Sequence, residues 1–109
     1  MVNQNFYTYR ITWSDEDQEF VGLCSEFPGL SWLEKDSGTA LDGIRKLVAE
    51  TIIDMESNGE KVPEPIAMKK FSGHIPLRVT PGLHRRLSLE AAEAGVSLNR
   101  LVSDKLSRD

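Results

Sequence analysis

The stretch GHIPLRVTPGLHRRL, residues 73–87, joins the pattern of a short β-strand directly to the start of a helix. Apolar residues occupy every second position in its first half, which is the period of a strand with one buried face. One face would carry His74, Pro76 and Arg78, and the opposite face Ile75, Leu77 and Val79. Thr80 and Pro81 then predict a helix start, because threonine caps the first turn and proline loses no hydrogen bond at the first helical position.

Two short helices are predicted after this strand. Gly95 predicts the end of the first helix, since glycine readily takes the left-handed conformation found there, and Ser97 predicts the cap of the second. Apolar residues at three- and four-residue spacings predict one buried stripe on each helix. The stripes consist of Leu83, Leu87, Ala91 and Ala94 in the first helix, and of Leu98, Leu101, Val102 and Leu106 in the second.

A lone strand with two short helices has too little surface to enclose a core, and its backbone hydrogen bonds stay open. A second copy solves both problems, because two such strands can pair antiparallel. Pairing would put the apolar faces of both strands on four helices and leave His74, Pro76 and Arg78 doubled on the solvent side. A two-stranded ribbon of this kind fits the major groove of DNA.

The two halves of the chain carry opposite charge, although the net charge is only −4. Two prolines in the segment 63–65 suggest a boundary there, with domains at 1–65 and 66–109. The first contains five Lys or Arg and thirteen Asp or Glu, and the second contains eight and four. The C-terminal half therefore suits a polyanion, and the acidic half suits a cationic partner.

The acidic half predicts an α+β domain. Strand patterns occupy YTYRITW (7–13), EFVGLCS (19–25) and the residues after the Pro-Gly turn of FPGLSWLEK (27–35), which predicts an antiparallel meander. A helix is expected to start at Ser37 or Thr39 and to stop at Asn58-Gly59. Its apolar stripe consists of Leu41, Ile44, Val48, Ile52 and Met55. The segment IAMKKF (66–71) suits either a fourth strand of this sheet or a linker.

The sequence argues against several functions. Cys24 is the single cysteine and its half contains no histidine, so a structural role is expected in place of a nucleophile. The acidic run at 15–19 is typical of a solvated turn, and we expect no catalytic residue, no metal site and no cofactor. No apolar run approaches the roughly 18 residues of a membrane span. The start MVNQNFYTYR lacks the features of a secretory leader, so a cytoplasmic protein is expected.

Two resemblances follow from these patterns. The run SGHIPLRVTPGLHRRLSLEAAEAGVSLNRLVSDKL, residues 72–106, resembles a ribbon-helix-helix DNA-binding domain of the Arc-like fold. The acidic half is similar to the N-terminal domain of HicB antitoxins, through YRITWSDEDQEFVGLCSEFPGLS (9–31), TALDGIRKLV (39–48) and GEKVPEP (59–65). The order of parts matches over nearly the whole chain.

The resemblance implies a two-part antitoxin. Its N-terminal domain would bind and block HicA, a small basic toxin that cleaves messenger RNA, and its C-terminal homodimer would repress the shared operon. A tetramer is a further option if the N-terminal sheet also self-associates. The resemblance assigns no residue to toxin binding.

The resemblance also implies which residues would contact operator DNA. The base-facing strand positions correspond to His74, Pro76 and Arg78, and the phosphate contact at the second helix corresponds to Ser97, Leu98 and Asn99. Among the strand residues, Arg78 can donate two hydrogen bonds to a guanine. Pro76 departs from the polar residue expected at the middle position, since it offers no hydrogen-bond donor.

Two other function classes compete with the antitoxin. A stand-alone ribbon-helix-helix repressor, whose N-terminal half only oligomerises or senses a ligand, would use the same DNA-binding residues. A nuclease acting through its carboxylates is the third class. We expect no enzyme, because the chain shows no paired catalytic spacing and contains only two histidines.

Overall fold

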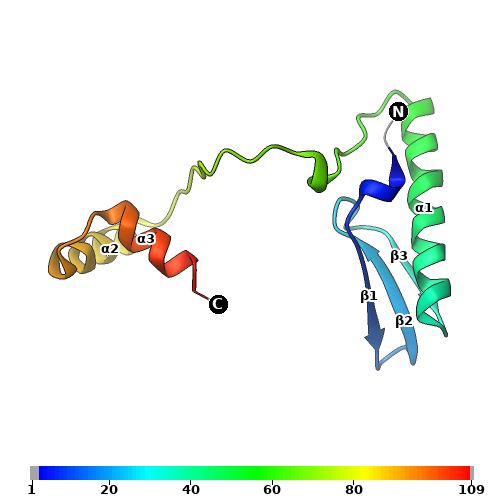
Figure 1. The fold of residues 1–109 in the computed structure, drawn as a ribbon, viewed down its shortest axis with the longest axis horizontal. Helices are drawn as coiled ribbons and strands as arrows, with labels where there is room; N and C mark the ends of the chain where they lie inside the picture. Colours follow the sequence, from blue (N-terminus) through cyan, green and yellow to red (C-terminus); the bar gives the residue numbers. More distant parts are fainter. Residues whose placement is uncertain (1–2, 109) are drawn as a thin grey trace. The chain divides into compact units, whose positions relative to one another are not determined.

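The computed structural model describes residues 3–108, and the chain forms two compact units. The first ends at Phe71 and the second begins at Ser72, beyond the boundary expected at residue 65. The chain is α+β, with a three-stranded sheet followed by helices (Figure 1). Within the described residues, no helix is long and apolar enough to cross a membrane.

The N-terminal unit is built on an antiparallel meander, as predicted. After a short 3₁₀ helix at Gln4–Phe6, strands β1 (Tyr9–Ser14), β2 (Glu19–Cys24) and β3 (Ser31–Glu34) pair in the order β1-β2-β3. The first strand begins two positions later than the pattern indicated, because Tyr7 caps the 3₁₀ helix. Tyr9 pairs with Cys24, and Gly22 pairs with Ile11 on one side and with Trp32 on the other.

Helix α1 (Ser37–Ser57) packs on one face of this sheet (Figure 1). The helix starts at Ser37, one of the two predicted positions, and its cap is Asp36, whose carboxylate accepts a hydrogen bond from the Thr39 amide at 3.0 Å. The stop is confirmed, since Gly59 has φ of 72°. The buried core combines the helix stripe with the sheet: Ile44, Val48 and Ile52 with Tyr7, Cys24 and Phe27.

Two glycines let α1 approach the sheet closely. A Cβ atom on Gly22 of β2 would lie 2.7 Å from the Ala40 carbonyl oxygen, and one on Gly43 of α1 would lie 2.1 Å from the Trp32 indole. These distances are far shorter than van der Waals contact. Glycine at both positions therefore sets the spacing between helix and sheet.

The segment 60–71, which we call the strap, follows α1 and is bonded to the N-terminal unit. The prediction of a fourth strand at IAMKKF is wrong. Ile66–Met68 forms a 3₁₀ helix. The Tyr7 hydroxyl donates to the Pro63 carbonyl at 2.6 Å, and the Ile66 amide donates to the Glu26 carboxylate at 2.8 Å. A side chain thus takes the amide that a strand would use for pairing, and the proline before it has no amide hydrogen.

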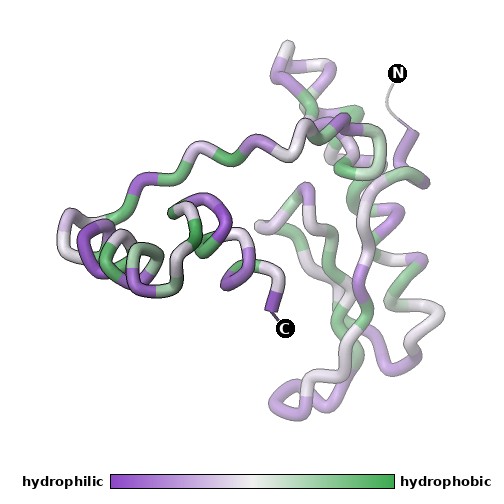
Figure 2. Tube along the Cα trace, turned by 60° about the vertical axis from the view of Figure 1, so that its left-hand side comes forward, coloured by the Kyte–Doolittle hydropathy of each residue, from purple (hydrophilic) through white to green (hydrophobic). Residues whose placement is uncertain are grey.

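The C-terminal unit contains helices α2 (Pro81–Ala94) and α3 (Leu98–Leu106), with the predicted caps. Thr80 and Ser97 accept hydrogen bonds from the Leu83 and Arg100 amides, and Gly95 has φ of 69°. Residues 74–80 form no strand within this single chain, although hydrophobic and hydrophilic residues alternate along them (Figure 2). Among the described residues of this unit, only Ala91 is buried.

Candidate nucleic-acid and partner surfaces

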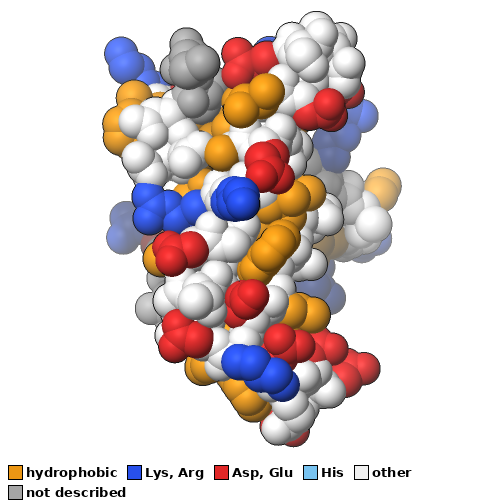
Figure 3. Space-filling view, turned by 90° about the vertical axis from the view of Figure 1, so that its right-hand side faces the viewer, with side chains coloured by type: hydrophobic (Ala, Val, Ile, Leu, Met, Phe, Trp, Pro, Cys, Tyr) orange, Lys and Arg blue, Asp and Glu red, His pale blue; other side chains and the backbone are white. Residues whose placement is uncertain are grey.

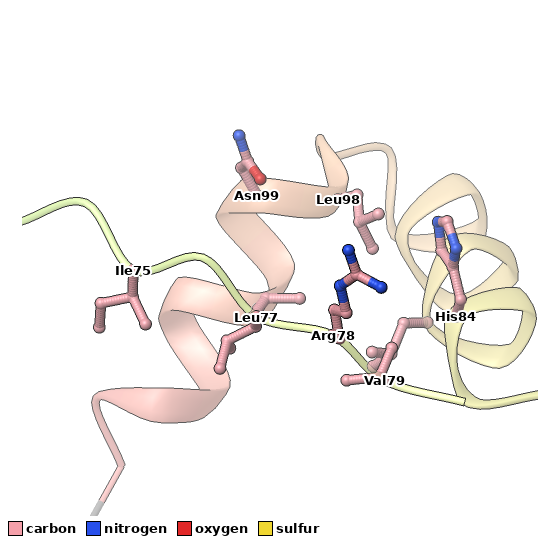
Figure 4. Close-up of a pocket in the computed structure, with 9 residues that line it drawn as sticks. Ile75, Leu77, Arg78, Val79, His84, Leu98 and Asn99 are labelled. Carbon is pink, nitrogen blue, oxygen red and sulfur yellow. The ribbon is translucent and has the colours of Figure 1, made fainter. Parts of the chain in front are cut away.

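An apolar groove of about 550 Å³ lies between the segment that precedes α2 and the two helices (Figure 4). It is lined by Ile75, Leu77 and Val79 from the segment, by Leu87 from α2, and by Leu98 and Val102 from α3. The segment's apolar residues are largely exposed; Leu77, for example, is 61% accessible. Large apolar side chains around an open groove indicate a surface that is completed by another chain.

The three residues predicted to face bases are all exposed, but the structure does not bring them together. Arg78 lines the groove with His84, whereas His74 and Pro76 do not. In Figure 4, Arg78 and Ile75 leave the segment on opposite sides, as alternation along a strand requires. The assignment of these residues to DNA bases stays a prediction.

The start of α3 has the features of a phosphate-binding site. The Ser97 hydroxyl accepts a hydrogen bond from the Arg100 amide at 3.0 Å, so the Ser97 side chain caps the helix. Leu98 is partly buried and Asn99 exposed, and both line the groove. Because the first amides of a helix point outward at its positive end, the backbone of Leu98 and Asn99 suits an anion better than their side chains do. Phosphate contact by these residues also stays a prediction.

The helix pair is held by contacts near its surface. Lys105 of α3 forms an ion pair with Glu90 of α2 at 3.0 Å, and both side chains are well exposed. A solvent-exposed pair of this kind contributes little to stability. The ion pair therefore adds little to the stability of the C-terminal unit, in which only Ala91 of the described residues is buried.

The N-terminal unit exposes acidic and hydrophobic side chains on the same face. Figure 3 shows acidic groups on both sides of a line of hydrophobic side chains, on the side of the unit that carries α1. Ile53 of α1 and the tryptophans Trp13 and Trp32 are among the exposed large hydrophobic residues. The opposite face of the sheet carries Val21, Leu23 and Leu33.

Glu26 is a residue that sequence reasoning missed. Its carboxylate accepts hydrogen bonds from the Thr8 amide at 2.9 Å and from the Ile66 amide at 2.8 Å, so it joins the start of β1 to the strap. Burial raises the pKa of Glu26, but these amide hydrogen bonds outweigh burial and hold the pKa below its ordinary value. A glutamate beside a Phe-Pro-Gly turn gives no signal of this role.

Cys24 is buried, as expected for a structural cysteine. Its thiol lies 3.6 Å from a carboxylate oxygen of Glu26, and burial raises the pKa of the thiol. A raised pKa disfavours the thiolate that a nucleophile needs. In the part of the chain that the structure describes, no group of three or more His, Cys, Asp or Glu is arranged to hold a metal ion.

Comparison with known proteins gives one family. Residues 56–106, from the end of α1 through α3, match the model of the HicB family. None of the curated proteins and none of the solved structures compared with the chain matches it. The matched segment contains 51 of the 109 residues, a little less than half of the chain.

Proposed function

We propose that this protein is the antitoxin of a type II toxin–antitoxin system. It neutralises a HicA-like, mRNA-cleaving toxin by direct binding, and it represses its own operon through a ribbon-helix-helix dimer. The observation that carries the proposal is the HicB-family match over residues 56–106. The acidic charge of the N-terminal half supports toxin binding, and the open groove of the C-terminal unit supports the ribbon-helix-helix dimer.

The DNA-binding part follows from the apolar groove. In a homodimer, the segment with Ile75, Leu77 and Val79 pairs antiparallel with the same segment of the second copy, and the paired strands cover both grooves. Each large apolar side chain that becomes fully buried contributes about 1.5–3 kcal/mol. The ribbon then presents its other face to the major groove, where Arg78 from each copy reads bases.

The start of α3 completes the interface with DNA. Its amides at Leu98 and Asn99 bind backbone phosphate, and Arg100 lies in the same turn. Phosphate contacts fix the position of the ribbon on the duplex without reading sequence. Sequence preference therefore depends mainly on Arg78.

The toxin-binding part follows from the charge of the N-terminal unit. Residues 1–71 contain seven Lys or Arg against thirteen Asp or Glu. A toxin that cleaves RNA carries a cationic surface for its anionic substrate. Opposite charge on the two partners steers their association and favours this pairing over nonspecific ones.

The second candidate is a stand-alone repressor whose N-terminal unit oligomerises or senses a ligand. It is favoured by the extent of the family match, which begins at residue 56 and leaves the sheet and most of α1 unmatched. Both candidates use the same C-terminal DNA contacts. They differ in whether a protein partner binds the N-terminal unit.

Purification of the tagged protein from its native host, at natural expression levels, separates the two candidates. A high-salt wash removes bound nucleic acid, and mass spectrometry identifies what remains. The antitoxin predicts a small basic protein in near-equal amount. Its repeated absence, while the protein still binds DNA specifically, would contradict the antitoxin and support the repressor.

A further inference from the structure

Strand pairing places Trp13, Phe20 and Glu34 side by side in the last row of the sheet. One row further in, α1 approaches β2 closely, where Ala40 and Ile44 meet Gly22. In the last row itself Trp13 is exposed, and Phe20 and Glu34 are partly buried.

Aromatic side chains on this face of the sheet form a surface that we call the aromatic ledge, defined as Trp13 and Phe20 of the last row and Trp32 of the neighbouring row. Trp13 and Phe20 pack edge to face with ring centroids 5.1 Å apart, and the Trp32 indole packs against Gly43. Packing holds the rings in place, yet Trp13 is 47% and Trp32 40% exposed. Ordered, accessible tryptophans lose little entropy on binding and are enriched among the residues that dominate interface energies.

An excess of negative charge surrounds the aromatic ledge. The segments 14–19 and 33–36, which flank it, contain one basic residue, Lys35. Their acidic residues are Asp15, Glu16, Asp17, Glu34 and Asp36, together with Glu19, whose pairing with Ser14 puts it on the other face of the sheet. The Trp13 indole N–H lies 3.4 Å from the Asp15 carboxylate, so ring and charge belong to one surface. Arginine and lysine suit such a surface, because they bind carboxylates and stack on indole faces.

We propose that the aromatic ledge and its acidic rim are the surface on which the N-terminal unit binds its toxin, with arginine or lysine side chains of the toxin against the indole rings. This inference rests on the proposed function and assigns it a site. Covering those cations would also exclude RNA, because the same positive groups are needed to hold the phosphate backbone. Neutralisation is then competitive with substrate RNA.

Two other surfaces of the unit fit a cationic partner less well. Ile53 is exposed on α1, but none of the exposed large hydrophobic residues of that helix is aromatic. The open face of the sheet carries Val21, Leu23 and Leu33, together with Arg10, Thr12 and Ser14 of β1 and Glu19 of β2. The one arginine offsets the one glutamate among these paired residues, so this face offers a cationic partner no excess of negative charge.

The test uses the full-length chain and, as the probe, the small basic protein recovered with it in the co-purification. Both tryptophans of the chain belong to the aromatic ledge, so tryptophan emission reports on this surface directly. With the emission of the partner alone subtracted, titration should shift the emission of the chain. An RNA oligonucleotide that the toxin binds should reverse this shift.

Substitutions then locate the binding surface. Trp13→Ala and Glu16→Lys should each weaken binding at least about tenfold, as expected for interface residues of this kind. Glu16→Lys changes an exposed turn residue and guards against a folding defect in Trp13→Ala. The matched controls Ile53→Ala and Glu50→Lys, which alter exposed residues of α1, should change the Kd less than about twofold.

The outcomes separate the two proposals. If no partner binds the wild-type chain, the proposed function fails. If the partner binds and folded Glu16→Lys and Trp13→Ala keep the wild-type Kd, the aromatic ledge is not the toxin site, while the antitoxin function stands.

Discussion

Arg78 combines an exposed guanidinium with a position on the rim of the apolar groove. In the proposed dimer, it would be the main side chain that reads base identity, since Pro76 has no donor and phosphate contacts carry no sequence information. Its planar fork matters as well as its charge, because it presents two parallel donors in a fixed geometry to guanine in the major groove.

Arg78→Ala should therefore weaken operator binding by about 1–3 kcal/mol for each guanine that the arginine recognises. Arg78→Lys keeps the charge and should keep nonspecific affinity while losing sequence preference. Fluorescence anisotropy with operator and scrambled duplexes at one salt concentration measures both. An unchanged ratio of the two affinities in Arg78→Ala would remove Arg78 from base recognition.

Glu26 acts at the same scale, through the hydrogen bonds that its carboxylate accepts from Thr8 and Ile66. The folded state holds its pKa below the ordinary value of 4.5. Its contribution to stability is therefore complete above that value and is lost as the pH falls through the lower folded-state pKa. The N-terminal unit should lose stability in this acid range.

Glu26→Gln should destabilise the N-terminal unit at pH 7, and the difference from wild type should shrink as the pH falls below about 4.5. Urea unfolding followed by tryptophan emission measures this, because both tryptophans lie in that unit. Glu50→Gln, an exposed carboxylate on α1, is the control. A difference between wild type and Glu26→Gln that is the same at neutral pH and about one pH unit below 4.5 would contradict this role.

At the scale of the elements, Gly22 and Gly43 allow α1 and the sheet to pack closely against each other. Alanine usually favours a helix over glycine by about 1 kcal/mol. At Gly43 the added methyl group would overlap the Trp32 indole, and overpacking of this kind costs about 1–3 kcal/mol. The cost exceeds the gain in helix propensity.

Gly43→Ala should therefore lower the free energy of unfolding by up to about 2 kcal/mol. It should also change the tryptophan emission, because the Trp32 ring must move. Gly29→Ala is the matched control, since a Cβ atom there meets nothing within 4 Å. Equal stability of the two variants in urea would show that the helix can shift without cost.

In the proposed dimer, the segment before α2 in one copy packs against helices α2 and α3 of both copies. Leu77 and Leu89 are equally exposed in the single chain, at 61% and 60%, but only Leu77 lines the groove. Burying a charge at Leu77 would leave it without a partner in the dimer. A charge at Leu89 would remain in solvent.

Leu77→Glu should convert the dimer to monomer and lose operator binding, whereas Leu89→Glu should keep both. Sedimentation velocity at matched concentrations and anisotropy with operator DNA measure the two effects. Wild-type mass for Leu77→Glu, or dissociation caused by Leu89→Glu, would place the interface elsewhere.

For the whole molecule, the strap decides where the two units can be separated. The Ile66 amide is bonded to Glu26 and lies within the first compact unit, which ends at Phe71. A break at the Pro-Glu-Pro segment would remove this bond from the N-terminal unit. The functional boundary that we propose therefore lies after residue 71.

A fragment of residues 1–71 should fold and bind the toxin without binding operator DNA. A fragment of residues 1–65 should melt at lower temperature, because the Ile66 hydrogen bond and the end of the strap are missing. Circular dichroism melts and toxin titration compare them. A folded 1–71 fragment that fails to bind toxin would contradict the modular antitoxin.

Local features of this protein could be predicted well from its sequence. The stop of α1 at Gly59 and the caps at Thr80, Gly95 and Ser97 appear where the pattern indicated, and the strands of the meander appear within two positions of it. Each depends on residues within a few positions of one another, through a cap, a turn or a period. The exposure of Ile75, Leu77 and Val79 in the C-terminal unit was equally predictable, because so short a unit cannot enclose the apolar surface that it carries.

Pairings between distant residues were out of reach of such patterns. Glu26 and Ile66 are 40 positions apart, and no periodicity relates them, so the sequence of IAMKKF suited a fourth strand as well as a linker. Trp13 lies on the face of the sheet on which α1 packs, yet it is 47% exposed, and no pattern in the sequence indicated how much of that face the helix covers. Local chain geometry set the elements of this protein, whereas the packing of α1 across the sheet set which side chains remain on the surface.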